Sequence, residues 1–110
     1  MHRNINPENI MVCYVNDEKV LKFSDFGTAK IPEDGQPNSL EECEQWYRPP
    51  ECLIKDKNYG MASDVFSLGV VFAEFYTLEP YFQGKNNYEQ MQLYCDVVGS
   101  PDKANYQEGY

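Results

Sequence analysis

Two short polar motifs stand at the two ends of a predicted β-hairpin, and they constrain the fold more than any other feature. The first motif is His2-Arg3-Asn4-Ile5-Asn6-Pro7-Glu8-Asn9, and the second is Asp25-Phe26-Gly27. Between them lie two apolar-rich runs, residues 10–15 and 20–24, joined by a polar turn at residues 16–19. Because a hairpin brings its two ends together, we predict that Asn9 and Asp25 lie across from each other.

The rest of the chain is predicted to be mostly helical. Residues 62–77 are apolar on nearly every face, which is typical of a buried helix. Asn86 or Asn87 can cap a second helix that ends near Val98, before Gly99 and Pro101. Residues 31–39 contain the proline, glycine, asparagine and aspartate of a loop. We therefore predict an α+β fold, a hairpin followed by a mostly helical region, in one domain at most.

The order of the motifs resembles the eukaryotic protein kinases of the CMGC group, which includes the cyclin-dependent, MAP and casein kinase 2 families. Residues 2–9 and 25–27 are similar to the family patterns H-R-D-x-x-x-x-N and D-F-G. Further matches follow at Trp46-Tyr47-Arg48-Pro49-Pro50-Glu51, Ser63-Asp64-Val65-Phe66-Ser67-Leu68-Gly69 and Val98-Gly99-Ser100-Pro101-Asp102. The resemblance implies that residues 1–110 are a partial kinase domain from the large, C-terminal lobe, with no N-terminal lobe. The branch within the group stays open, because residues 79–84 and 87–90 resemble casein kinase 2 instead.

By this resemblance, Asn9 and Asp25 are the magnesium positions of the family, and its cofactors are Mg²⁺ and ATP. In the family the ion is shared with nucleotide phosphates, and magnesium is held weakly without them. The glycine-rich loop and the lysine that hold those phosphates belong to the N-terminal lobe. We therefore expect the isolated chain to bind neither.

Three departures from the family pattern fall in the groups that handle protons and charge. Asn4 stands where the family has its catalytic aspartate, and Asn6 stands at the position of a catalytic lysine. Glu44 replaces a threonine that contacts the aspartate. An amide does not take a proton near neutral pH, so we predict a pseudokinase or a truncated product with a binding or regulatory role. Two alternatives stay open: Glu44 compensates as the base, or the chain is part of an active Ser/Thr kinase completed by residues or a chain not present here.

Other family positions are retained. His2 and Phe26 belong to a stacked hydrophobic column, Asp64 accepts backbone hydrogen bonds from the catalytic loop, and Glu51 has a structural part. Because the burial of Asp64 would be costly without those donors, the resemblance predicts that the loop stays in place.

The resemblance also implies regulatory and substrate-binding positions. Ser39 lies where many CMGC kinases carry an activating phosphate, and Arg3 and Lys30 lie where the family pairs with it. The alternative is an unmodified loop serine, with Glu41 or Glu42 as the partner of Arg3. Glu44, Trp46 and Arg48 fall in the substrate-binding stretch, where the arginine favours a proline after the target residue. Arg48 alternatively pairs with a neighbouring acid.

Composition narrows the class of protein. The net charge is −9 without a basic patch, which disfavours nucleic-acid binding. No apolar run is long enough for a membrane span, no secretory signal is evident, and we expect an intracellular protein of the cytoplasm or nucleus. The four cysteines lack metal-binding spacing and are predicted to be reduced thiols. We expect residues 65–76 to leave an apolar surface uncovered, at Val70, Phe72, Phe75 and Tyr76, which a protein partner or self-association would bury.

Overall fold

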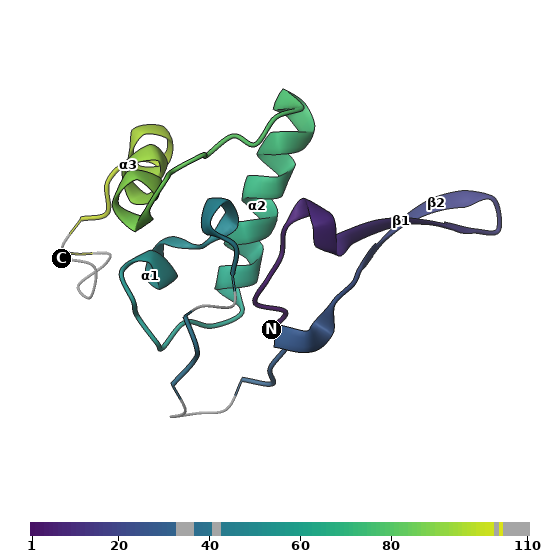
Figure 1. Ribbon diagram of the computed structural model, residues 1–110, viewed down its shortest axis with the longest axis horizontal. Helices are drawn as coiled ribbons and strands as arrows, with labels where there is room; N and C mark the ends of the chain where they lie inside the picture. The colour runs from purple at the N-terminus through teal and green to yellow at the C-terminus, as the bar shows by residue number, and fades with distance from the viewer. Residues whose placement is uncertain (33–36, 41–42, 103, 105–110) are drawn as a thin grey trace.

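The computed structural model describes residues 1–32, 37–40, 43–102 and 104 (Figure 1). Its elements, with η for a 3₁₀ turn, are η1 (Pro7–Asn9), β1 (Ile10–Val15), β2 (Glu18–Phe23), η2 (Phe26–Thr28), η3 (Gln45–Tyr47), α1 (Pro50–Leu53), α2 (Ala62–Thr77) and α3 (Asn87–Val98). The predicted order, a hairpin followed by helices, is confirmed, and so is the α+β class.

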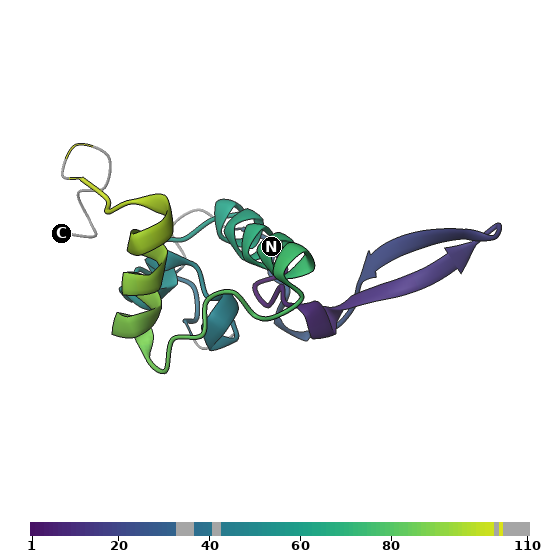
Figure 2. The same cartoon turned by 90° about the horizontal axis from the view of Figure 1, so that it is seen from above.

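The hairpin pairs β1 and β2 antiparallel, from Ile10 opposite Phe23 to Val15 opposite Glu18. The predicted four-residue turn is wrong, because only Asn16 and Asp17 lie between the strands. Their φ angles are 51° and 65°, so both adopt the left-handed conformation that a two-residue turn needs and that these residue types tolerate. The hairpin extends away from the helices in two perpendicular views (Figures 1 and 2).

The helical part has a small core of its own. The η3 turn contacts both α2 and α3, and α1 packs against α3 (Figure 1). Buried side chains from all four elements form one cluster. The buried apolar residues of this cluster are Ile5, Tyr47, Leu53, Val70, Val71, Phe82 and Tyr94. Ile5 belongs to the first polar motif, so that motif is anchored in the core.

The bounds of α2 match the predicted helix, and it is buried on one face rather than on all sides, as its uncovered apolar surface was expected to require. Its buried residues, Ser63, Ser67, Val70 and Val71, recur at the spacing of one helix face. Two of them are serines whose hydroxyls bond to neighbouring segments: Ser67 Oγ donates to the Tyr47 carbonyl at 2.7 Å, and Ser63 Oγ donates to the Glu51 carboxylate.

The opposite face of α2 carries large apolar side chains that are exposed. Phe72, Phe75 and Tyr76 are exposed as expected, and the Tyr76 side chain reaches 88%. The expectation for Val70 is wrong, because it is only 5% exposed and faces the core. The helix therefore buries small side chains and presents large apolar ones to solvent.

The last helix is confirmed at both ends. Asn86 caps α3 by accepting a hydrogen bond from the Glu89 backbone nitrogen at 3.0 Å. Gly99 ends it with a φ of 89°, a conformation that favours glycine. Within the part of the chain that the structure describes, no helix has the length and apolar character to cross a membrane.

Candidate functional site

An open cleft of about 450 Å³ brings together six of the predicted site residues: Asn4, Asn6, Asn9, Asp25, Glu44 and Arg48. It lies where the first motif, the turn after β2 and the approach to η3 meet, and its lining residues are Asn4, Asn6, Glu8, Asn9, Asp25, Cys43, Glu44 and Arg48. The base of the hairpin helps to assemble it, because the Ser24 backbone nitrogen donates to the Asn9 carbonyl at 2.9 Å. Asn9 and Asp25 thus share one cleft, as the sequence predicts.

Asn6 has a structural role in this cleft. It is the N-cap of η1, and its buried Oδ1 accepts hydrogen bonds from the backbone nitrogens of Glu8 at 2.9 Å and Asn9 at 3.3 Å. Its Nδ2 donates to Asn4 Oδ1 at 3.1 Å. A lysine has no acceptor with which to cap the turn, so an amide suits this position.

Asn4 is held by acceptor bonds on both of its oxygens. Its Oδ1 accepts the Asn6 amide and also the Glu44 backbone nitrogen, the latter at 3.3 Å. Its backbone carbonyl accepts Asn9 Nδ2 at 2.9 Å. The side chain at position 4 is therefore oriented in the cleft by donors that would serve a carboxylate as well, but the amide present is not a base.

Asn9 and Asp25 both line the cleft, and their side chains carry oxygens of the kind that magnesium prefers. Asn9 uses its Nδ2 as a donor to Asn4, which turns its amide oxygen toward other partners. Asp25 is left-handed, with a φ of 57°, and its Oδ1 accepts the Gly27 backbone nitrogen at 3.2 Å. Among the described residues, histidine, cysteine and acidic side chains form no group of three that could hold a metal. The two positions fit magnesium only with further ligands, such as water or phosphate oxygens.

Arg48 closes one side of the cleft through neutral partners. Its Nε and Nη2 donate to the Cys43 carbonyl at 3.1 Å and 2.8 Å, and its Nη1 donates to Asn87 Oδ1 at 3.3 Å. Within the described residues these contacts are to carbonyl and amide oxygens rather than to an acid. The arginine therefore ties the segment before η3 to the start of α3.

Asp64 fixes the backbone of the first motif. Its two carboxylate oxygens accept the backbone nitrogens of His2 at 2.7 Å and Arg3 at 2.8 Å. Arg3 has a φ of 69°, and these two bonds support its left-handed backbone. The orientation of the motif toward the cleft thus depends on a side chain of α2.

The His2 ring joins the first motif to the hairpin and to the second motif. The ring lies 5.2 Å from that of Phe26, edge to face, and 5.8 Å from that of Phe23. Its Nδ1 accepts the Asn4 backbone nitrogen at 3.3 Å, so Nε2 is the nitrogen that donates to the Ser24 carbonyl at 2.8 Å. These contacts place both motifs on one scaffold.

The predicted regulatory residues are only partly brought together. Arg3 Nε donates to the Thr28 carbonyl at 2.5 Å, whereas Lys30 Nζ donates to Asn38 Oδ1 at 3.2 Å. The Ser39 side chain is exposed, and its carbonyl accepts the Tyr59 hydroxyl. The alternative partners of Arg3, residues 41 and 42, lie outside the described residues.

Gln90 is the residue that sequence reasoning missed. Its side chain is fully buried, and its Nε2 donates to the carbonyls of Trp46 at 3.0 Å and Phe82 at 3.2 Å. Its Oε1 accepts the Gly84 backbone nitrogen at 2.8 Å. Trp46 was predicted to bind substrate, and its carbonyl is bound by this buried glutamine of the core. The available signal was Tyr94, one turn along the helix, whose hydroxyl accepts Gln90 Nε2 at 2.9 Å.

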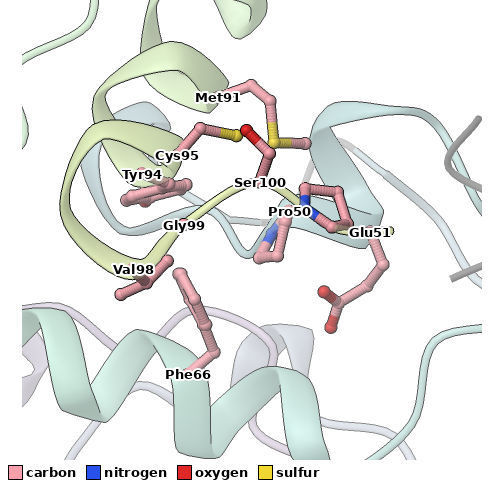
Figure 3. A pocket seen from close by; sticks show the side chains of 10 residues that line it. Pro50, Glu51, Phe66, Met91, Tyr94, Cys95, Val98, Gly99 and Ser100 are labelled. Atoms are coloured by element: carbon pink, nitrogen blue, oxygen red, sulfur yellow. The ribbon is translucent and has the colours of Figure 1, made fainter. Parts of the chain in front are cut away.

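A second cavity, apolar and about 320 Å³ in volume, lies between α1, α2 and α3 (Figure 3). Phe66, Met91, Cys95 and Val98 point into it, and the Glu51 carboxylate lies at one side. It shares no lining residue with the polar cleft. Its lining lacks the converging polar groups of a catalytic site, so the chemistry belongs to the cleft.

The two buried cysteines are poor nucleophiles. Burial raises the pKa of the Cys43 thiol to about 11 and that of the Cys52 thiol to about 12. A thiol in this state stays protonated at neutral pH and is unreactive. Cys43 therefore lines the cleft without offering it a nucleophile.

Comparison with known proteins gives one consistent result. A family model described as "Protein kinase domain" matches residues 1–108. The chain is 35% identical to Serine/threonine-protein kinase ICK of Rattus norvegicus over 109 residues, which is 99% of this chain and 17% of that protein. It is 34% identical to Cyclin-dependent kinase F-4 of Oryza sativa subsp. japonica, over 98% of this chain and 23% of that protein. It is 40% identical to MAPK/MAK/MRK overlapping kinase of Mus musculus, over 91% of this chain and 23% of that protein.

Proposed function

This chain belongs to the protein kinase domain family, its relatives are CMGC-type kinases, and we propose that residues 1–110 are a large-lobe segment that does not transfer phosphate by itself. The large-lobe placement is supported by the order of the elements. A single described hairpin separates the first motif from Asp25-Phe26-Gly27, and helices follow. The chain spans between about a sixth and a quarter of the length of these relatives.

The observation that carries the proposal is the amide at position 4. Asn4 Oδ1 sits in the cleft as an acceptor for Asn6 Nδ2 and for the Glu44 backbone nitrogen. It occupies the position of the family's base, yet it does not take up a proton. Loss of a general base lowers a rate by roughly 10²–10⁴-fold, or about 3–5 kcal/mol of barrier. The neighbouring lysine position is given to Asn6, whose oxygen caps η1, and this change removes a positive charge from the cleft as well.

What remains suits binding. Asp64, His2 and Phe26 hold the loop in place, and Asn9 and Asp25 keep the oxygens that the family uses for Mg²⁺. When bound, Mg²⁺ and ATP would supply the charge neutralisation and the phosphoryl group. We propose a binding role in which a protein partner, or a second copy of the chain, covers the exposed apolar side chains of α2. Large apolar patches on a protein surface mark such contacts.

A second candidate is part of an active Ser/Thr protein kinase, completed by residues or a chain outside these 110. Glu44 favours it, because this carboxylate lines the same cleft as Asn4 and could take the proton in its place. The short span of the chain relative to its relatives is equally in line with this candidate.

A steady-state assay separates the two candidates. The chain is incubated with Mg²⁺, labelled ATP and a Ser/Thr-Pro peptide, beside the Asp25→Ala variant and a heat-killed control. We expect no label above the control. Turnover that withstands stringent purification and disappears in the Asp25→Ala variant would establish the second candidate.

Nucleotide binding is measured apart from turnover. A thermal-shift assay at millimolar Mg·ATP is expected to show no stabilisation, since a ligand stabilises appreciably only above its dissociation constant. A shift that the Asp25→Ala variant abolishes would show that the cleft binds nucleotide although it does not use it.

A further inference from the structure

We propose that Asn38 anchors the segment that follows Asp25-Phe26-Gly27. Its neutral amide binds Lys30, where the family resemblance expects a phosphate. In this arrangement residues 38 and 39 are held against residues 57–59 without modification of Ser39. The inference concerns conformation, and it stands whether or not the chain transfers phosphate.

The Asn38 side chain is only 8% exposed, and both polar atoms of its amide form hydrogen bonds. Its Oδ1 accepts Lys30 Nζ at 3.2 Å, and its Nδ2 donates to the Tyr59 carbonyl at 2.8 Å. Its backbone nitrogen donates to the Lys57 carbonyl at 2.9 Å. One residue thus joins the segments on both sides of it, at residue 30 and at residues 57–59.

Tyr59 reinforces the same junction. This tyrosine is buried, and its hydroxyl donates to the Ser39 carbonyl, next to Asn38. Residues 38 and 39 are therefore attached to the segment after α1 by hydrogen bonds that are buried or partly buried. Breaking such bonds leaves buried polar groups without partners, which is costly, so this attachment is favoured.

Lys30 carries the connection on to the cleft. Its backbone nitrogen donates to the Met1 carbonyl at 2.9 Å, and its carbonyl accepts the amino terminus at 2.8 Å. Met1 directly precedes His2, which packs on Phe26. Asn38 therefore links residues 57–59, through Lys30, to the backbone that enters the polar cleft.

A phosphate on Ser39 would compete with this arrangement. It adds a charge of about −1.5 to −2 one residue from Asn38 and would offer Lys30 a stronger, charge-assisted partner. Because Lys30 already has a buried partner, such a modification would replace an existing contact rather than order a loose segment.

Hydrogen exchange measured by mass spectrometry tests the proposal on the 110-residue chain. Asn38→Ala is compared with Asn58→Ala, a matched control whose exposed side chain has no contact with another described residue through its amide, only a backbone bond to Asp56. We expect Asn38→Ala to raise exchange roughly tenfold in peptides that cover residues 37–40 and 57–59. Asn58→Ala should leave the same peptides within about twofold of the parent chain. Equal exchange in the two variants would overturn the proposal.

Lys30→Met provides the second arm, which decides the matter if Asn38→Ala prevents folding. It keeps the unbranched apolar stem of the side chain and removes the charged ammonium group that donates to Asn38. We expect exchange at residues 37–40 to rise about threefold to tenfold in Lys30→Met. The double variant, Lys30→Met with Asn38→Ala, should exchange no faster than Asn38→Ala alone, because both substitutions remove the same hydrogen bond. Unchanged exchange in Lys30→Met would show that this hydrogen bond does not hold residues 37–40 in place, and would overturn the proposal.

Discussion

Replacing Gln90 by leucine tests the packing of the helical part most severely. The substitution keeps the volume of a fully buried side chain and removes its hydrogen bonds. Two main-chain groups then lose the partner that the structure gives them, the Phe82 carbonyl and the Gly84 nitrogen. The Trp46 carbonyl keeps a second donor, the Tyr94 hydroxyl at 3.3 Å.

The expected loss of stability follows from those two groups. A buried polar group left without a partner costs about 1–3 kcal/mol, so we expect Gln90→Leu to lower the free energy of unfolding by about 2–6 kcal/mol. Whole domains are stable by only about 5–15 kcal/mol, so this loss is a large part of the total. With a urea dependence of about 1–3 kcal/mol per molar, the midpoint should fall by roughly 1 M or more.

The assay is urea unfolding followed by tryptophan fluorescence, because Trp46 is the single tryptophan and its carbonyl accepts the Gln90 amide. The matched control is Gln92→Leu, the same substitution at an exposed position of the same helix. It should stay within about 0.5 kcal/mol of the parent chain. If Gln90→Leu unfolds at the same urea concentration as Gln92→Leu, the buried amide does not hold this core together.

Three further predictions concern packing, pH and association. Gly84→Ala should lower the free energy of unfolding by about 1–3 kcal/mol in the same assay, since its methyl group would come within 2.5 Å of the α3 backbone. Gly60→Ala should lower it by less, because its methyl group meets no atom within 4 Å. Stability should be constant below pH 9 and fall as pH rises from 9 toward 12, because the raised pKa values of Cys43 (about 11) and Cys52 (about 12) keep the folded thiols neutral while the unfolded thiols ionise. Unfolding midpoints that do not move between pH 7 and 11 would contradict this. Light scattering after size exclusion should find the chain self-associated, and Phe75→Ser should shift it toward the monomer; a sharp monomer with a cooperative melt would show that the α2 face needs no cover.

Local sequence signals predicted most of the secondary structure. The two longer helices begin and end where the sequence places them: α2 (Ala62–Thr77) by its apolar run, and α3 (Asn87–Val98) by the Asn86 cap and Gly99. The turn failed because Glu18 and Lys19 are polar, and polar residues occur as readily on an exposed two-stranded hairpin as in a loop. The choice between the two depends on the left-handed backbone at Asn16 and Asp17, which a four-residue reading does not require.

The burial of α2 could not be read from its hydropathy. Ser63 and Ser67 face the core because their hydroxyls bond to Glu51 and to the Tyr47 carbonyl, partners that are distant in sequence. The large apolar residues then fall on the other side. A hydropathy pattern reports how much apolar surface a helix carries, but not which neighbours are present to cover it.

The sequence predicted which residues form the candidate site better than it predicted the hydrogen bonds between them. Asn9 and Asp25 reach one cleft because a hairpin joins them, which the sequence makes evident. That Asn6 caps η1 and bonds to Asn4 depends on the backbone path of the loop, and so does the choice of Asn38 as the partner of Lys30. These contacts involve amide side chains, and no repeating sequence pattern indicates which residue an amide will bind.

A single-turnover measurement shows whether the chain transfers phosphate, because it follows the chemical step without regard to product release. The chain, in excess over labelled Mg·ATP, is mixed with peptide and quenched over seconds to hours, beside Glu44→Gln and Asp25→Ala. We expect no phosphoryl group to reach the peptide or the chain itself beyond the rate without protein, in any of the three samples. Transfer by the parent chain that is lost in both variants would mean that Glu44 serves as the base and that the chain is an active kinase segment.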